Sequence, residues 1–112
     1  DHDYGMKIIQ AHQASFKKSP RVVEGGVVQF LDDDPKNPGW FLGIDGDGTR
    51  GYFPKSWFKV DTAAATALRD YDASELSVAE GKECTLIEEC GAWARITCEE
   101  GTGWIPFSCL KK

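Results

Sequence analysis

The chain has 112 residues, of which 41% are hydrophobic and 12% aromatic, so it has enough apolar side chains for a folded core and is not a disordered acidic tail. The net charge is −5; residues 1–61 carry 8 basic and 9 acidic side chains, and residues 62–112 carry 5 and 9. Neither half has the basic stripe that binding to nucleic acid or to an anionic membrane surface needs, and no apolar run approaches the roughly 18 residues of a membrane span.

The first residues are DHDYG, followed by Met6. They are either a remnant of recombinant expression ahead of a native initiator Met6, or the start of a fragment cut from a larger protein. We favour a remnant for residues 1–5. The sequence shows no secretory signal peptide.

The first half predicts short strands separated by turns. Gly25 and Gly26 interrupt the chain before a β-branched run, and the polar stretch 32–39 is rich in turn-forming residues. Asp45-Gly46 favours a tight hairpin turn, because these residues tolerate the positive φ that such turns require. Strands are expected at the start of 7–16 and at 27–31, 40–44 and 52–54, with one helical turn at 55–57.

The second half predicts the same order of elements. It opens with ALRDYDA and continues with SELSVAEGK, in which Gly81 marks a turn. Two short polar segments, 89–91 and 99–101, then separate apolar runs. Strands are expected at 84–88, 93–98 and 104–106.

One eight-residue phrase occurs twice. GYFPKSWF occupies 51–58 and GWIPFSCL occupies 103–110, which is 52 residues later. Other residues recur with similar offsets, since Trp40 corresponds to Trp93 and Gly25 to Gly81. Self-similarity of this kind indicates an internal duplication.

Short strands with frequent turns and a duplicated pattern predict an all-β protein made of two small barrels. The first is expected at 7–60 and the second at 66–112, with 61–65 (DTAAA) as a short linker. A single sandwich built from the whole chain is the alternative. We favour two barrels, because the Trp and Pro positions repeat.

Each half resembles a Src homology 3 (SH3) domain, and the resemblance covers nearly all of residues 7–111. The second half has ALRDYDA where the family has an Ala-Leu-Tyr-Asp-Tyr motif, followed by ELS, a turn glycine, Trp93 and GWIP. The first half has EGG, PGWF and GYFPKSWF, and its opening KIIQAHQASF is closer to the variant form found in bacterial proteins.

This resemblance implies two five-stranded barrels in tandem, each with an aromatic groove for proline-rich peptides. Such peptides form an extended polyproline II helix without internal hydrogen bonds. Flat aromatic faces can contact its ridges, and indole or phenol groups can donate hydrogen bonds to its carbonyls.

Ten residues match the family's groove positions. The first groove is expected to contain His12, Trp40, Tyr52, Pro54 and Trp57. The second is expected to contain Tyr71, Trp93, Trp104 and Pro106, with Glu75 as its acidic residue.

Several positions depart from the family pattern. Gln10 and Arg69 stand where the family has its first motif tyrosine, and Cys109 stands where Trp57 stands in the first half. The second groove is therefore expected to be incomplete. In the first half, Lys17 and Lys18 replace the usual acidic residues of the first long loop, so 32–34 (DDD) is the candidate partner for a basic group of the ligand.

Two motifs suggest other chemistry but fail on context. Residues 46–51 fit G-x-G-x-x-G, but a strand and a proline follow instead of the helix N-terminus that a dinucleotide needs. Asp45-x-Asp47 is similar to the start of a calcium loop, but its twelfth residue is Ser56 rather than Glu. No nucleophile–base pair or phosphate cradle is found, so we expect no enzymatic activity and no cofactor.

All four cysteines lie in the second half, at 84, 90, 98 and 109. They form no Cys-x-x-Cys pair, and the only histidines are His2 and His12, so no zinc or other metal site is expected. Two disulfides are the alternative to four free thiols. Free thiols in a reducing cytoplasm are favoured, because Cys84 and Cys98 lie in apolar segments where cysteine packs as a small hydrophobe.

The sequence therefore predicts a non-enzymatic, cytoplasmic interaction module that binds proline-rich or extended peptide segments, mainly on the first barrel. The expected partner is a protein or peptide, not nucleic acid or a membrane, and no oligomeric state is assigned. The alternative is a scaffold or oligomerisation unit whose grooves are covered by barrel–barrel packing. Recognition of cell-wall peptide is a third class of function, and a protein with that function would need an export signal.

Overall fold

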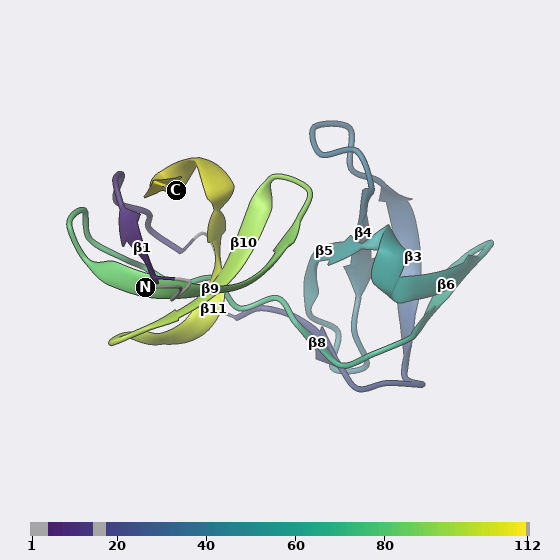
Figure 1. Ribbon diagram of the computed structural model, residues 1–112. Helices are drawn as coiled ribbons and strands as arrows, with labels where there is room; N and C mark the ends of the chain where they lie inside the picture. The colour runs from purple at the N-terminus through teal and green to yellow at the C-terminus, as the bar shows by residue number, and fades with distance from the viewer. Residues whose placement is uncertain (1–4, 15–17, 112) are drawn as a thin grey trace. The chain divides into compact units, whose positions relative to one another are not determined.

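A computed structural model describes residues 5–14 and 18–111 (Figure 1). Within these residues the fold is all-β, as the sequence predicts, with antiparallel sheets and no α-helix. Two single turns of 3₁₀ helix, η1 (Lys55–Trp57) and η2 (Phe107–Cys109), follow the two prolines of the repeated phrase. No helix in the described part of the chain is long and apolar enough to cross a membrane. Residues 1–4 of the expected remnant lie outside the described residues.

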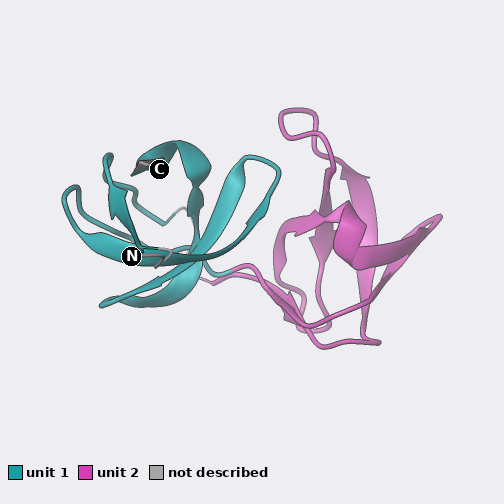
Figure 2. Cartoon of the chain, in the orientation of Figure 1, with its two compact units in different colours: residues 1–17, 74–112 teal, residues 18–73 magenta. Residues whose placement is uncertain are grey.

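The chain divides into two compact units (Figure 2). Unit 2 is the continuous segment 18–73, and unit 1 combines 1–17 with 74–112. This division differs from the expected boundaries of 7–60 and 66–112. The difference arises because unit 1 takes the strand Gly5–Ile8 from the first half of the chain, and unit 2 takes the strands Ala64–Ala67 and Tyr71–Asp72 from beyond residue 60.

Unit 2 contains a five-stranded antiparallel sheet and a small two-stranded sheet. The five strands have the order β5-β4-β3-β7-β6 across the sheet. The small sheet pairs β2 (Arg21–Val22) with β8 (Tyr71–Asp72). The five strands are β3 (Val27–Asp33), β4 (Trp40–Ile44), β5 (Arg50–Pro54), β6 (Phe58–Asp61) and β7 (Ala64–Ala67).

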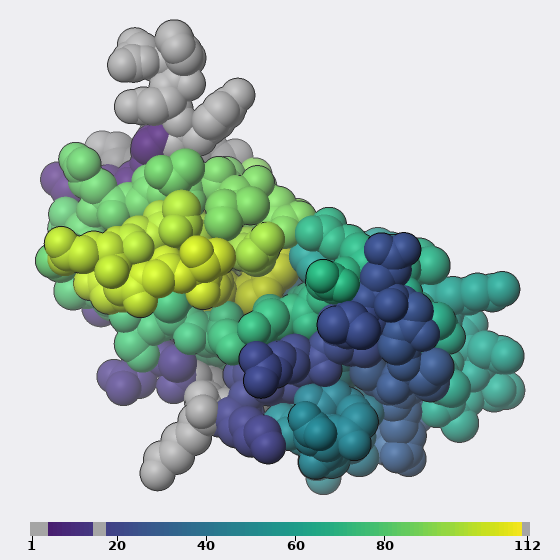
Figure 3. Space-filling model, turned by 90° about the horizontal axis from the view of Figure 1, so that it is seen from below, coloured from purple at the N-terminus to yellow at the C-terminus, as the bar shows by residue number. Residues whose placement is uncertain are grey.

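Unit 1 contains a second five-stranded antiparallel sheet with the order β11-β10-β9-β1-β12. Its C-terminal residues (yellow) lie against the green residues of the same unit in the space-filling view (Figure 3). The five strands are β1 (Gly5–Ile8), β9 (Glu83–Cys90), β10 (Trp93–Cys98), β11 (Gly101–Pro106) and β12 (Leu110–Lys111).

The two large sheets have the same internal pairing. The N–H of Ile8 in β1 donates to Lys82 O at 2.9 Å, and the N–H of Ala67 in β7 donates to Gly26 O at 2.8 Å. The carbonyls of Ile8 and Ala67 each accept from a turn glycine, Gly81 and Gly25, at 2.8 Å. β1 in unit 1 and β7 in unit 2 therefore occupy equivalent places, so the two strands are exchanged relative to the repeats in the sequence.

Residues 61–65, expected as the linker, lie in a hairpin of unit 2. Asp61 ends β6 and Ala64 begins β7, and Thr62 between them has a positive φ of 42°. Ala65 and Ala67 are buried, with 0% and 2% of their surfaces exposed. Alanine is a weak strand former, but here its small side chain fits a crowded core.

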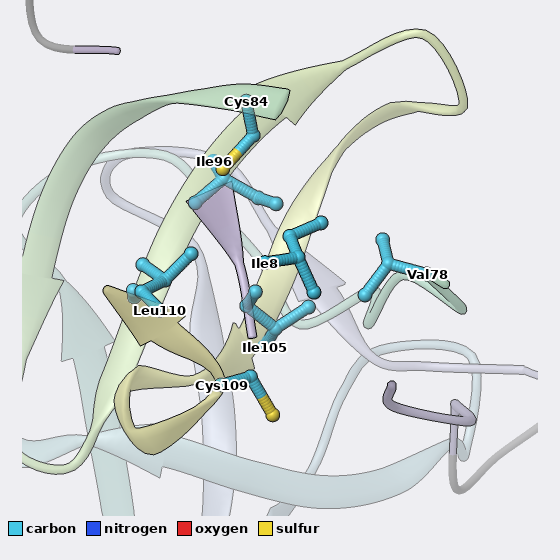
Figure 4. Packing of buried hydrophobic residues seen from close by; sticks show 8 residues of the cluster. Ile8, Val78, Cys84, Ile96, Ile105, Cys109 and Leu110 are labelled. Atoms are coloured by element: carbon cyan, nitrogen blue, oxygen red, sulfur yellow. The ribbon is translucent and has the colours of Figure 1, made fainter. Parts of the chain in front are cut away.

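The cores of the two units differ in character. In unit 2, Phe41 and Phe53 are fully buried and stack at 5.3 Å between ring centroids, with Phe58 edge-on to both. Unit 1 has an aliphatic and thiol core, in which Ile8 lies in the middle with Val78, Ile96 and Ile105 around it (Figure 4). The full cluster is Ile8, Val78, Cys84, Ala94, Ile96, Ile105, Cys109 and Leu110.

Candidate functional site

An aromatic cluster forms in unit 2 from residues of β5, η1 and β8. We define the aromatic cluster as Tyr52, Trp57 and Tyr71. Tyr71 meets Trp57 edge-on, with 5.4 Å between ring centroids, and its hydroxyl donates a hydrogen bond to the Tyr52 carbonyl at 2.9 Å. Tyr71 also contacts Phe53 of the core at 5.5 Å. The cluster is therefore anchored to the core through one residue.

Arg69 lies over the Trp57 ring. Its guanidinium carbon is 3.5 Å from the ring centroid, which is a cation–π contact. The backbone places it there, because the Leu68 N–H donates to Trp57 O at 2.8 Å. The sequence marked Arg69 only as a replaced tyrosine, and nothing in the motif pattern predicted its contact with Trp57.

The expected residues of the first groove differ strongly in exposure. Tyr52 exposes 40% of its surface and Trp57 is half-buried. Trp40 exposes 6% and Pro54 is fully buried. Trp40 pairs with Pro54 across β4 and β5, so both belong to the packed part of the sheet. The accessible aromatic surface is therefore made by Tyr52 and Trp57.

The carboxylates of the acidic stretch 32–34 have partners within unit 2. Asp34 is buried and accepts hydrogen bonds from the Lys36 N–H at 3.0 Å and from Asn37 Nδ2 at 2.9 Å. Asp33 forms an ion pair with Lys55. Asp32 accepts from the Asp33 N–H at 2.8 Å. These carboxylates therefore stabilise the loop, and a basic ligand would have to compete with these contacts.

Asp45 holds the hairpin turn between β4 and β5. Its carboxylate accepts from the N–H groups of Asp47 and Thr49, both at 2.9 Å, and of Arg21 at 3.2 Å. Burial opposes ionisation, but these backbone donors outweigh it and keep the pKa of the Asp45 carboxyl below its ordinary value. The carboxylate of Asp45 therefore has a structural role.

Unit 1 places a polar pair at the equivalent site. His12 Nε2 lies 2.9 Å from Glu75 Oε1, and the His12 ring meets Trp93 edge-on at 6.1 Å. The side chains of His12 and Glu75 are only 16% and 12% exposed. Backbone hydrogen bonds between His12 and Val78, at 3.0 and 2.9 Å, fix the two segments side by side.

The remaining residues expected in the second groove are buried or half-buried. Trp104 exposes 2% of its surface, and its backbone pairs with the segment around Glu75. Pro106 and Trp93 are half-buried. Cys109, which stands at the position of Trp57, exposes 3% and belongs to the core.

The structure groups two site residues differently from the sequence prediction. His12 was expected beside Trp40, Tyr52, Pro54 and Trp57, but it lies in unit 1 with Glu75 and Trp93. Tyr71 was expected in the second groove, but it joins the aromatic cluster of unit 2. The reason is the strand exchange, because β1 leads into His12 and β7 leads into Tyr71.

None of the four cysteines, all of which lie among the described residues, forms a disulfide. Burial raises the pKa of the Cys84 and Cys109 thiols, with the neighbouring Cys98 adding to the effect at Cys84. Burial and the contact between Cys98 Sγ and Glu100 Oε1, at 3.1 Å, raise the pKa of Cys98. A raised pKa keeps a thiol protonated and so makes it a poor nucleophile.

No protein-family model matches the chain, and no curated protein or solved structure matches it either.

Proposed function

We propose that the chain is a non-enzymatic interaction module built from two SH3-like barrels, and that unit 2 binds an extended, proline-containing peptide. The support for SH3-like barrels is twofold. The family motifs recur in both halves of the sequence, and the two five-stranded sheets share one strand order.

The observation that carries the peptide-binding proposal is the convergence of Tyr52, Trp57 and Tyr71 in unit 2. The Tyr52 ring is exposed, and the Trp57 ring is half-buried with the Arg69 guanidinium over it. Tyr71 joins the two positions, because its hydroxyl bonds the Tyr52 backbone and its ring meets Trp57 edge-on. Rigid, partly exposed aromatic rings suit a polyproline II ligand, which is already extended before it binds. The Tyr52 phenol can donate to a ligand carbonyl.

Unit 1 is proposed to have a structural role instead. Its aromatic wall has Cys109 in place of Trp57. His12 and Glu75 contact each other through their polar atoms and so do not present flat apolar faces to a ligand. Buried interaction surfaces lose large contacts when an aromatic residue is missing. Peptide binding is therefore assigned to unit 2 alone.

A scaffold function is the second candidate, and burial favours it. Trp40, Tyr71 and Trp104 expose 6%, 4% and 2% of their surfaces, so much of the expected aromatic wall is not available to a ligand. In that case the chain would serve as a rigid unit within a larger assembly. An array of proline-rich peptides of both orientations separates the two candidates. Binding of any of them at micromolar concentration supports the first, and no binding across the array supports the second.

We also propose a cytoplasmic location. The support is the set of four cysteines without a disulfide, which suits a reducing compartment. Thiol titration, described below, tests this independently of peptide binding.

A further inference from the structure

The two exchanged strands differ in side-chain size at equivalent places. In unit 1, β1 contributes Met6 and Ile8, and Ile8 is 0% exposed. In unit 2, the equivalent strand β7 contributes Ala65 and Ala67, which are 0% and 2% exposed. Backbone pairing is the same for both strands, so the hydrogen bonds alone do not decide which strand enters which sheet.

The cores that receive these strands differ in the opposite sense. Phe41 pairs with Phe53 in unit 2, whereas the corresponding pair in unit 1 is Ala94 with Ile105. The residue that pairs with the exchanged strand near its end is Phe58 opposite Ala67 in unit 2 and Leu110 opposite Ile8 in unit 1. The phenylalanine core of unit 2 therefore receives the small alanine side chains of β7. The core of unit 1, which has smaller side chains at these positions, receives the large side chains of β1.

Gly43 shows how full the core of unit 2 is. A methyl group added there would lie 2.7 Å from Gln29 O, 3.0 Å from Phe53 Cε1 and 3.1 Å from Phe41 Cε2. The equivalent residue of unit 1 is Ile96, which is fully buried in the cluster of Figure 4. Unit 2 therefore has no room for one more carbon at this position, and unit 1 accommodates a whole isoleucine.

We propose that core volume selects the strand exchange. If each half of the chain folded on its own strand, Met6 and Ile8 would enter the phenylalanine core, and Ala65 and Ala67 would face the smaller core of unit 1. The first arrangement overpacks a close-packed interior, and the second leaves a cavity. Both effects disfavour separate barrels at 7–60 and 66–112.

Engineered disulfides measure which pairing forms. Lys7 lies opposite Glu83 in the exchanged fold, and in the unexchanged fold it would take the place of Thr66 opposite Val27. The variants K7C/E83C and K7C/V27C are equilibrated in a glutathione redox buffer and mapped by peptide mass spectrometry. We expect cross-linking of K7C/E83C to exceed that of K7C/V27C by at least about tenfold, which corresponds to about 1.4 kcal/mol. Equal cross-linking, or an excess for K7C/V27C, would overturn the exchange.

The role of volume is tested by trading the two side chains. Ile8→Ala combined with Ala67→Ile should lower the ratio of the two cross-links by about tenfold or more, because each core now fits the strand of its own half. An unchanged ratio in this folded double variant would mean that volume does not select the pairing.

If the double variant does not fold, the single variant Ala67→Val tests the role of core volume. In a full core, Ala67→Val should lower the melting temperature, although valine is the better strand former. A melting temperature that stays the same or rises would show spare room beside β7 and would overturn the volume argument. Thr66→Val on the same strand is the control, since Thr66 is not fully buried and the change keeps the side-chain shape.

Discussion

The hydroxyl of Tyr71 donates to the backbone carbonyl of Tyr52 at 2.9 Å, across 19 residues of sequence. This bond joins β8 to the strand that carries the most exposed ring of the aromatic cluster. Tyr71 is 4% exposed, whereas Tyr52 is 40% exposed. The buried Tyr71 therefore holds the backbone of β5 in place, and the exposed Tyr52 offers its ring to a ligand.

Tyr71→Phe should destabilise the protein by about 1 kcal/mol, because it leaves a partly buried carbonyl without its donor. Urea unfolding followed by tryptophan fluorescence measures this. Tyr52→Phe is the matched control, since it removes a hydroxyl from the same cluster and keeps the carbonyl. Equal stability of the two variants would show that the bond has no energetic role.

Trp57→Ala should weaken peptide binding by roughly 2 kcal/mol, or about 30-fold, because it removes an accessible ring of the aromatic cluster. Trp93→Ala should leave most of the affinity. Both tryptophans are half-buried, which makes them a matched pair. Titration of the best array peptide against each variant, after a circular dichroism check of folding, gives the comparison. A larger loss for Trp93→Ala would move the binding site to unit 1.

Thiol titration in denaturant without reductant should give four thiols per chain. In the native protein, Cys84 and Cys109 should react slowly at neutral pH, because both are buried and their pKa values are raised. Their rates should increase with pH as the thiolate fraction grows. A count near zero in denaturant would reveal two disulfides and contradict a cytoplasmic location.

Asp45→Asn should destabilise the protein at pH 7 by about 1 kcal/mol, because an amide cannot accept all three backbone N–H groups. Folding lowers the pKa of Asp45, so the ionised carboxylate stabilises the fold above its ordinary value of 3.8. That stabilisation is lost as the pH falls below this value through the lowered pKa. Urea unfolding of the original protein and of Asp45→Asn, from pH 7 downward, should therefore show that their difference in unfolding free energy decreases in acid. A difference that stays constant with pH would show that the substitution acts through the shape of the side chain rather than its charge.

The sequence predicted the hairpins well, because their signals are local. The Asp45-Gly46 turn lies between β4 and β5, and both repeats of the phrase at 51–58 and 103–110 form a strand followed by a 3₁₀ turn. Turn chemistry and strand patterning act within a few residues, so a single sequence is enough to place them.

The exchange could not be predicted in the same way. Two strands with the same hydrogen-bonding pattern compete for two equivalent places, and their apolar pattern fits either one. The discriminating quantity is the volume of a core assembled from residues far apart in sequence, such as Ala67 with Phe58 and Ile8 with Leu110. The grouping of His12 and Tyr71 was wrong for the same reason.

Unit 2 is one continuous segment inserted between the two segments of unit 1, so unit 2 is a guest domain and unit 1 is its host. Residues 18–73 form every strand of unit 2, and their ends meet, since the Ala73 N–H donates to Pro20 O at 3.0 Å. On the host side, Ala14 and Ser77 are also hydrogen-bonded neighbours at 2.9 Å. A gene encoding 18–73 alone should therefore yield a folded protein, and a short turn should be able to replace that segment in unit 1. Cooperative thermal unfolding of each product would establish that the two are separable, and a molten excised segment would show that guest and host depend on each other.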